Sequence, residues 1–184
     1  KSKGFIPNKT ATHKYDLTDV FDLSKKDIQN YISEFNNSKL FSEISLYRGV
    51  KDFLCKLNLS FELVVISSCG VDNKIMRIGN LEKEFGKNFF KDIRTVDLGK
   101  SKRDILSQYP SSFWIEDLVD NCALGNDVGH KSLLINRPWN QDDKNNVKRF
   151  FSYEAIYKHI KKQDGDLFIT QRSLSFCCTV LTNR

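Results

Sequence analysis

The chain has 184 residues, of which 40% are hydrophobic, so its length and composition favour one domain with a buried core and argue against a disordered or fibrous protein. The longest apolar candidates, Leu63 to Ile66 and Phe176 to Leu181, are strand-length and fall far short of the roughly 20 residues that cross a bilayer. The formal charge is +6, but Lys and Arg are scattered among Asp and Glu. This charge pattern is typical of a solvated surface and fits an anionic small substrate equally well, so we expect no membrane segment and consider a nucleic-acid partner unlikely.

The cysteine pattern favours a reducing compartment. Five cysteines form an odd set without Cys-x-x-Cys spacing, which argues against a disulfide framework or a zinc site and predicts a cytoplasmic location. The first residue is Lys1 rather than Met, and no signal-peptide pattern follows it, so an upstream segment stays open as a possibility. The cysteines are Cys55, Cys69, Cys122, Cys177 and Cys178.

The first 45 residues have a helical pattern. Ser24 is a good N-cap residue, and Asp27 follows in the first turn of the expected helix. Apolar residues recur at helical spacing from Ile28 to Phe35, which predicts one buried face. We therefore expect residues 1–45 to form a small helical cap-like segment that precedes the main fold.

Residues 46–162 alternate between helical and strand patterns. Helical patterns alternating with short apolar runs predict parallel strands joined by right-handed crossovers, hence an α/β sheet with helices on both faces. Residues 163–184 form a C-terminal extension with strand-forming residues. The expected helices are 49–57, 74–85, 101–108 and a stretch near Asn121, and the expected strands are 61–66, 93–96, 113–115 and 132–135.

Polar side chains follow three of these strands where each strand ends. Ligands of open α/β sheets bind at the carboxyl ends of the strands, so we expect these side chains to converge on one crevice. A hydroxyl can hold phosphate oxygens, a lysine neutralises their charge, and a carboxylate binds Mg²⁺. Each feature alone also has an ordinary structural explanation as a turn, a solvated side chain or a helix cap. The residues are Ser67 and Ser68, Lys100 and Lys102, and Glu116 and Asp117.

Three short motifs in this order resemble those of the haloacid-dehalogenase-like (HAD) phosphohydrolases. The stretch 64–68 resembles motif II, 102–106 resembles motif III, and 114–121 resembles motif IV. Within this superfamily, residues 46–140 are most similar to 5'(3')-deoxyribonucleotidases, and the family resemblance as a whole covers roughly residues 15–140. The resemblance implies a HAD-like Rossmannoid sheet, a helical cap, Mg²⁺ as cofactor, and a nucleotide monophosphate or other phosphate ester as substrate.

The resemblance also implies roles for individual residues. Ser67 would hydrogen-bond the phosphate with Ser68 beside it, and Lys102 would be the motif III lysine, with Lys100 as a close competitor. Arg137 would help to shape the substrate pocket.

The metal site follows from the same resemblance. Asp117 would ligate Mg²⁺, and Glu116 and Asn121 would support the site.

The nucleophile motif of the family is missing. It requires a strand ending in Asp-x-Asp-x-Thr or Val, in which the first Asp attacks phosphorus and the second is the general acid and base. The stretch beginning at Asp16 has the wrong spacing and no preceding apolar strand. Asp164 and Asp166 have the right spacing, but Phe168 stands where a small or hydroxyl residue is expected.

Without that strand, the predicted sheet would have two open strand edges in its centre. Three explanations remain open: a strand from a missing N-terminal segment, a strand from a protein partner, or the C-terminal run 174–181 filling the vacant position.

Two main functions follow from these observations. The first is a magnesium-dependent 5'-nucleotidase-type phosphatase that is incomplete without its nucleophile motif. The alternative is a catalytically inactive HAD-fold module for binding or assembly. A third, weaker possibility is a nucleic-acid-associated protein that uses its positive surface and binds with strong salt dependence.

Overall fold

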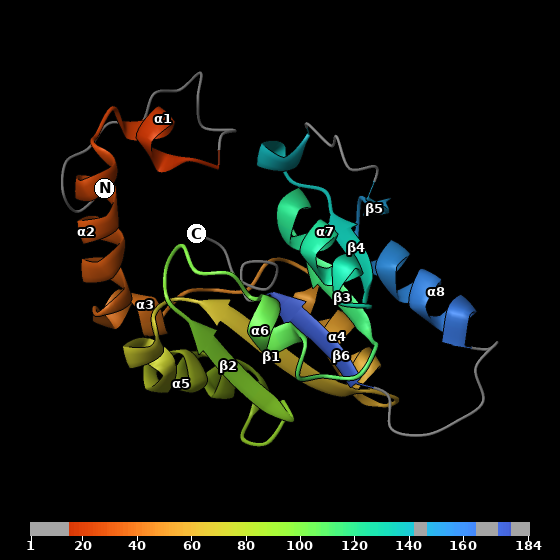
Figure 1. Cartoon of the computed structure of the whole chain (residues 1–184). Helices are drawn as coiled ribbons and strands as arrows, with labels where there is room; N and C mark the ends of the chain where they lie inside the picture. Colours follow the sequence, from red (N-terminus) through yellow and green to blue (C-terminus); the bar gives the residue numbers. More distant parts are fainter. Residues whose placement is uncertain (1–14, 142–146, 165–172, 178–184) are drawn as a thin grey trace.

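The computed structural model describes residues 15–141, 147–164 and 173–177, and shows a parallel β-sheet flanked by helices (Figure 1). Within these residues the sheet has six strands in the order β2-β1-β6-β3-β4-β5, and every neighbouring pair is parallel. The prediction of a parallel α/β sheet is therefore confirmed. The strands are β1 (Glu62–Ser68), β2 (Asp92–Val96), β3 (Phe113–Glu116), β4 (Lys131–Ile135), β5 (Arg149–Phe150) and β6 (Ser173–Cys177).

Helices cover both faces of the sheet. In Figure 1, α6 lies in front of the sheet and α4 lies behind it; α6 packs with α7, and α4 packs with α8. The strongly apolar strand β1 is buried along Leu63 to Ile66, as expected of a strand covered on both sides. These helices are α4 (Val50–Asn58), α5 (Lys74–Phe85), α6 (Arg103–Leu106), α7 (Val119–Asp127) and α8 (Tyr153–Asp164), with 3₁₀ turns η1 (Val71–Asn73) and η2 (Pro138–Asn140).

The N-terminal segment folds into α1 (Leu17–Phe21), α2 (Lys25–Asn36) and α3 (Lys39–Ser42). Ser24 caps α2 as expected, because its hydroxyl accepts a hydrogen bond from the backbone N–H of Asp27 at 3.1 Å. The segment is attached to the core mainly through α5. Asn80 donates to the carbonyls of Ser42 and Ile44, at 3.1 and 3.0 Å.

Helix α7 lies very close to the sheet. A Cβ atom on Gly125 would lie 2.5 Å from Cδ1 of Trp114 and 2.6 Å from Oγ of Ser132, so only glycine fits this contact. Trp114 is fully buried in β3, and its indole N–H donates to the carbonyl of Asn121 at 3.1 Å. This contact fixes the first turn of α7 against the amino half of β3.

Strand β6 fills the centre of the sheet. Ser175 is in register with Val64 on β1 and with Trp114 on β3, so the inner edges of both neighbours are paired. Of the three explanations for the missing central strand, the C-terminal run is the one that the structure bears out for residues 174–177. The remainder of that run, 178–181, lies outside the described residues.

The structure agrees with the rejection of Asp164 as a relocated nucleophile, because Asp164 is the last residue of α8 rather than the end of a strand. Asp166 and Phe168 lie outside the described residues. Other sequence predictions need correction. Helix α6 is four residues long, shorter than the expected 101–108. Sequence patterns also missed the two-residue strand β5 and helix α8.

Three cysteines are free thiols: Cys55 is exposed, and Cys69 and Cys122 are buried. Among the described residues, no helix combines the length and the apolar character that crossing a membrane would require.

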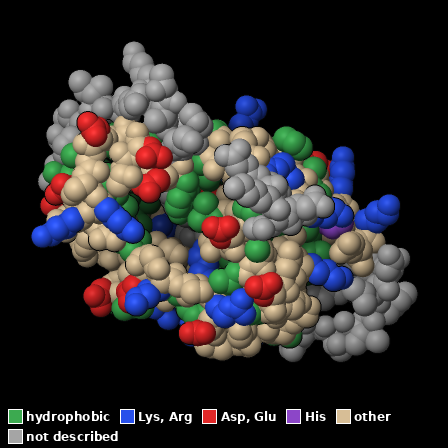
Figure 2. Space-filling model, turned by 45° about the horizontal axis from the view of Figure 1, so that its top comes forward, with side chains coloured by type: hydrophobic (Ala, Val, Ile, Leu, Met, Phe, Trp, Pro, Cys, Tyr) green, Lys and Arg blue, Asp and Glu red, His purple; other side chains and the backbone are tan. Residues whose placement is uncertain are grey.

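On the face displayed in Figure 2, acidic and basic side chains are interspersed, as their mixture along the sequence suggested.

We predict that Ser175→Pro strongly destabilises the fold. Proline removes a backbone donor from the central strand, and an unsatisfied buried ladder carbonyl alone costs roughly 1–3 kcal/mol. Ser175→Ala is the matched control, because it keeps the backbone N–H. Chemical denaturation of both variants, and of a chain lacking residues 174–184, measures the effect. Equal stability of the proline variant and the alanine variant, or an unchanged melting temperature after truncation, would contradict the central position of β6.

Candidate functional site at the carboxyl edge of the sheet

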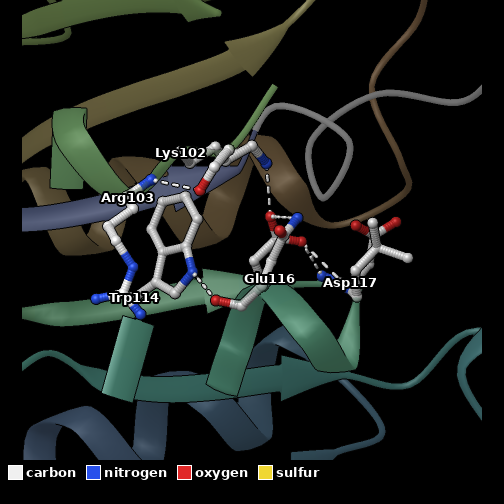
Figure 3. A network of polar contacts seen from close by, with 8 residues as sticks. Lys102, Arg103, Trp114, Glu116 and Asp117 are labelled. Carbon is white, nitrogen blue, oxygen red and sulfur yellow. Dashed lines mark hydrogen bonds and ion pairs between the residues drawn. The ribbon is translucent and has the colours of Figure 1, made fainter. Parts of the chain in front are cut away.

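The buried charges of the fold meet at the carboxyl edge of the sheet. Lys102 precedes α6 in the crossover after β2, and Glu116 ends β3; they are 3% and 0% exposed. Lys102 Nζ lies 2.6 Å from Glu116 Oε1, which makes a buried ion pair (Figure 3). The expectation that these two side chains converge is therefore confirmed.

Glu116 is held by hydrogen bonds to both of its oxygens. Oε1 also accepts from the amide of Asn121 at 2.8 Å, and Oε2 accepts from the backbone N–H groups of Asp117 and Leu118 at 2.8 and 3.2 Å. A carboxylate has about four acceptor positions, and four donors point at this one. A metal ion bound to Glu116 would have to replace some of these donors, so the arrangement is that of an internal brace.

Asp117 is also fully buried, next to this brace. Its backbone carbonyl accepts a hydrogen bond from Asn140 at 2.9 Å, and the same amide donates to the carbonyl of Ile135 at 2.8 Å. Arg149 in turn donates to Oδ1 and to the backbone carbonyl of Asn140, each at 2.6 Å. Asn140 thus connects the ends of β3 and β4 and fixes the backbone that carries Asp117.

Arg137 is engaged with aromatic side chains. Its guanidinium lies 4.2 Å from the ring centre of Tyr47, and Nη2 donates to the hydroxyl of Tyr153 at 2.6 Å. Burial raises the pKa of Tyr153 well above its usual range, although the charge and the hydrogen bond of Arg137 act in the opposite direction. Tyr153 therefore stays a neutral phenol. Arg137 links Tyr47, which precedes α4, to Tyr153 at the start of α8.

The remaining predicted residues differ in burial. Ser67 is 2% exposed near the end of β1, whereas Ser68 is half-buried. Lys100 is exposed, and its backbone N–H donates to the carbonyl of Asp97 at 3.1 Å. Of the two competing lysines, Lys102 is the one that the fold brings to Glu116.

The structure also contains a pocket that sequence reasoning missed. It has a volume of about 220 Å³ and lies where α2 faces the loops after β1 and β2. Asparagine side chains form much of its wall, and asparagine carries little signal in a single sequence. Among its lining residues are Asn36, Asn73, Asp72 and Asp97.

No set of three or more His, Cys, Asp or Glu side chains within the described residues is arranged to hold a metal ion. Comparisons with protein-family models, with curated proteins and with solved structures each give no match. The chemistry of the site therefore has to follow from its geometry.

We predict that Lys102→Met destabilises the chain by about 3–5 kcal/mol, because it leaves the Glu116 carboxylate buried without its ion-pair partner. The double variant Lys102→Met, Glu116→Leu removes both charges and should recover much of that loss. Urea unfolding of the two single variants and the double variant gives the coupling free energy.

The exposed pair Lys91 and Glu62, with a 3.1 Å separation, is the matched control. Its removal by Lys91→Met should cost about 1 kcal/mol or less. A similar small effect at Lys102 would contradict the assignment of a buried brace.

Proposed function

We propose that this chain is a HAD-like domain that binds a phosphate ester, foremost a nucleotide monophosphate, at the carboxyl edge of its sheet and does not hydrolyse it. The order of the elements supports the resemblance. Ser67 lies near the end of one strand, and Lys102 lies in the crossover that follows the next. Glu116 ends a third strand, and Asp117 follows it. In the HAD family, motifs II, III and IV occupy such places.

The position of β6 carries the proposal. In the family that the chain resembles, the central strand ends in the nucleophilic aspartate. Here β6 occupies the centre of the sheet, and residues 173–184 contain no Asp or Glu. Both inner edges of β1 and β3 are paired with β6. A strand that carried the nucleophile would have to displace β6, so the proposed domain lacks a group to attack phosphorus.

The proposed ligand site combines a hydroxyl with a buried positive charge. Ser67 can donate a hydrogen bond to a phosphate oxygen, and the Lys102 ammonium, which Glu116 also binds, adds positive charge at the same edge of the sheet. Mg²⁺ fits less well, because the Glu116 oxygens already accept four hydrogen bonds and no set of three acidic, thiol or imidazole side chains in the described residues is arranged to hold a metal. We therefore propose that phosphate binding does not depend on Mg²⁺.

The second candidate is a magnesium-dependent 5'-nucleotidase completed by a strand from elsewhere. The convergence of Lys102 and Glu116, with Asp117 alongside, favours it, because the family's phosphatases use residues of these types at these places. This function requires β6 to leave the centre of the sheet when the completing strand arrives. Turnover would then depend on Mg²⁺ and on Asp117.

We predict that the chain binds deoxynucleotide monophosphates in calorimetric titrations and releases no phosphate from them with Mg²⁺. Ser67→Ala should weaken binding by about tenfold or more, since a hydrogen bond to a charged group contributes roughly 1.5–3 kcal/mol. Lys100→Ala is the control, because this exposed lysine lies outside the buried pair.

Two outcomes would change the assignment. Phosphate release that requires Mg²⁺ and disappears in Asp117→Asn would establish the nucleotidase. Absence of both binding and release would refute a phosphate-ester site.

A further inference from the structure

The pocket between α2 and the loops after β1 and β2 has an acceptor-rich wall. Asn36 and Asn73 are 5% and 7% exposed, and both donate their side-chain N–H to the carbonyl of Cys69, at 3.1 and 3.0 Å. These two bonds fix the amide orientation, because a flipped amide would place its oxygen against the Cys69 carbonyl. The Oδ1 atoms of both residues are therefore directed away from Cys69.

Neither Oδ1 atom accepts a hydrogen bond from the part of the chain that the structure describes. Neither oxygen is sealed from solvent, and both residues line the pocket, so these acceptors are open to a molecule that binds there. Water can satisfy both acceptors in the free protein, and a bound molecule with two or more donors would replace that water at positions that the Cys69 contacts already fix.

Two carboxylates lie at the same pocket. Asp97 is held in place because its Oδ1 accepts a hydrogen bond from the backbone N–H of Val71 at 3.1 Å. Asp72 also lines the pocket and is exposed. No Lys, Arg or His side chain of the described residues lines it. The wall is thus negative on a chain whose formal net charge is +6.

We propose that this pocket binds an ammonium or guanidinium head group of an organic cation. The head group would donate to Asn36 Oδ1 and Asn73 Oδ1 and be balanced by Asp72 and Asp97. A bare divalent metal fits less well, since no metal-binding set of three acidic, thiol or imidazole groups occurs in the described chain. The pocket, at about 220 Å³, is smaller than the roughly 300–1,000 Å³ that enclose whole small molecules, so it accommodates a head group.

The same head group could belong to a free amine or to a lysine or arginine side chain of a protein partner. The site rests on the Asn36, Asn73 and Asp97 geometry alone and does not depend on the phosphate-ester proposal.

The test is a ¹H–¹⁵N NMR titration of the full chain at constant ionic strength, with n-butylammonium as the probe and n-butanol as its uncharged equivalent. We expect saturable shifts of the Asn36 and Asn73 side-chain amides and of the Gly70 N–H with butylammonium. Butanol should bind at least about tenfold more weakly, because it lacks the charge and two of the donors. Methylguanidinium tests the second head group.

Asp97→Asn and Asp72→Asn should each weaken butylammonium binding severalfold, and asparagine at 97 can still accept from the Val71 N–H. Asp104→Asn is the matched control, because Asp104 is exposed on α6 and does not line the pocket. A blocked Ala-Lys-Ala peptide separates the two sources. Binding at least as tight as that of butylammonium indicates a protein side chain, and exclusion of the peptide while the amine binds indicates a free small molecule.

Three results would overturn the proposal: equal binding of butanol and butylammonium, identical affinity in Asp97→Asn and Asp104→Asn, or shifts of the Asn36 and Asn73 amides with Mg²⁺ but not with any amine.

Discussion

The backbone pairing of β6 with β1 and β3 is the constraint on which the rest of the structure depends. On one side of β6 the sheet consists of β1 and β2, and on the other side of β3, β4 and β5. Ser67 belongs to the first part and Glu116 to the second, so the ladders of β6 set how far apart these side chains lie. Because β6 comes last among the strands in the chain, the edge of the sheet takes its final geometry only when this long-range pairing forms.

The Glu116 brace is the second requirement of this edge. A buried carboxylate is tolerated only when it is paired and hydrogen-bonded, and Glu116 receives donors from Lys102, Asn121 and two backbone N–H groups. These donors come from the α6 crossover and from the start of α7, so the ion pair ties both elements to the end of β3. Removing either Lys102 or Glu116 alone leaves a buried charge without a partner, which lowers the stability of the fold. The ion pair therefore has a structural role whether or not the site performs chemistry.

The sequence predicted much of the fold because its strongest patterns are local. The helix 74–85 has the expected bounds, and the run 61–66 marks the buried strand β1 to within two residues. Sequence patterns missed strand β5 because two residues carry no periodicity. The place of β6 depends on pairing with residues far away in the sequence: Leu174 is in register with Leu63 on β1 and with Phe113 on β3. At the site, the rule that polar residues gather at the carboxyl ends of parallel strands predicted that Lys102 lies near Glu116. Only the three-dimensional structure shows that Lys102, and not Lys100, pairs with Glu116. Nothing in the sequence indicated the asparagine-lined pocket, because Asn36 is positioned there by a hydrogen bond to the carbonyl of Cys69, 33 residues later in the chain.

The same asparagine contacts determine how the N-terminal helices sit on the core. Asn36 at the end of α2 is bonded to the Cys69 carbonyl, and the Arg77 guanidinium lies 4.3 Å from the Phe41 ring centre beside α3. Asn80 donates to the carbonyls of Ser42, the last residue of α3, and of Ile44 just after it. Three separate contacts, each with a buried polar side chain, therefore hold α2 and α3 against the core. Opening the pocket by moving α2 would break the hydrogen bond from Asn36 to the Cys69 carbonyl. The proposed ligand would therefore bind a pocket whose shape is already set before binding.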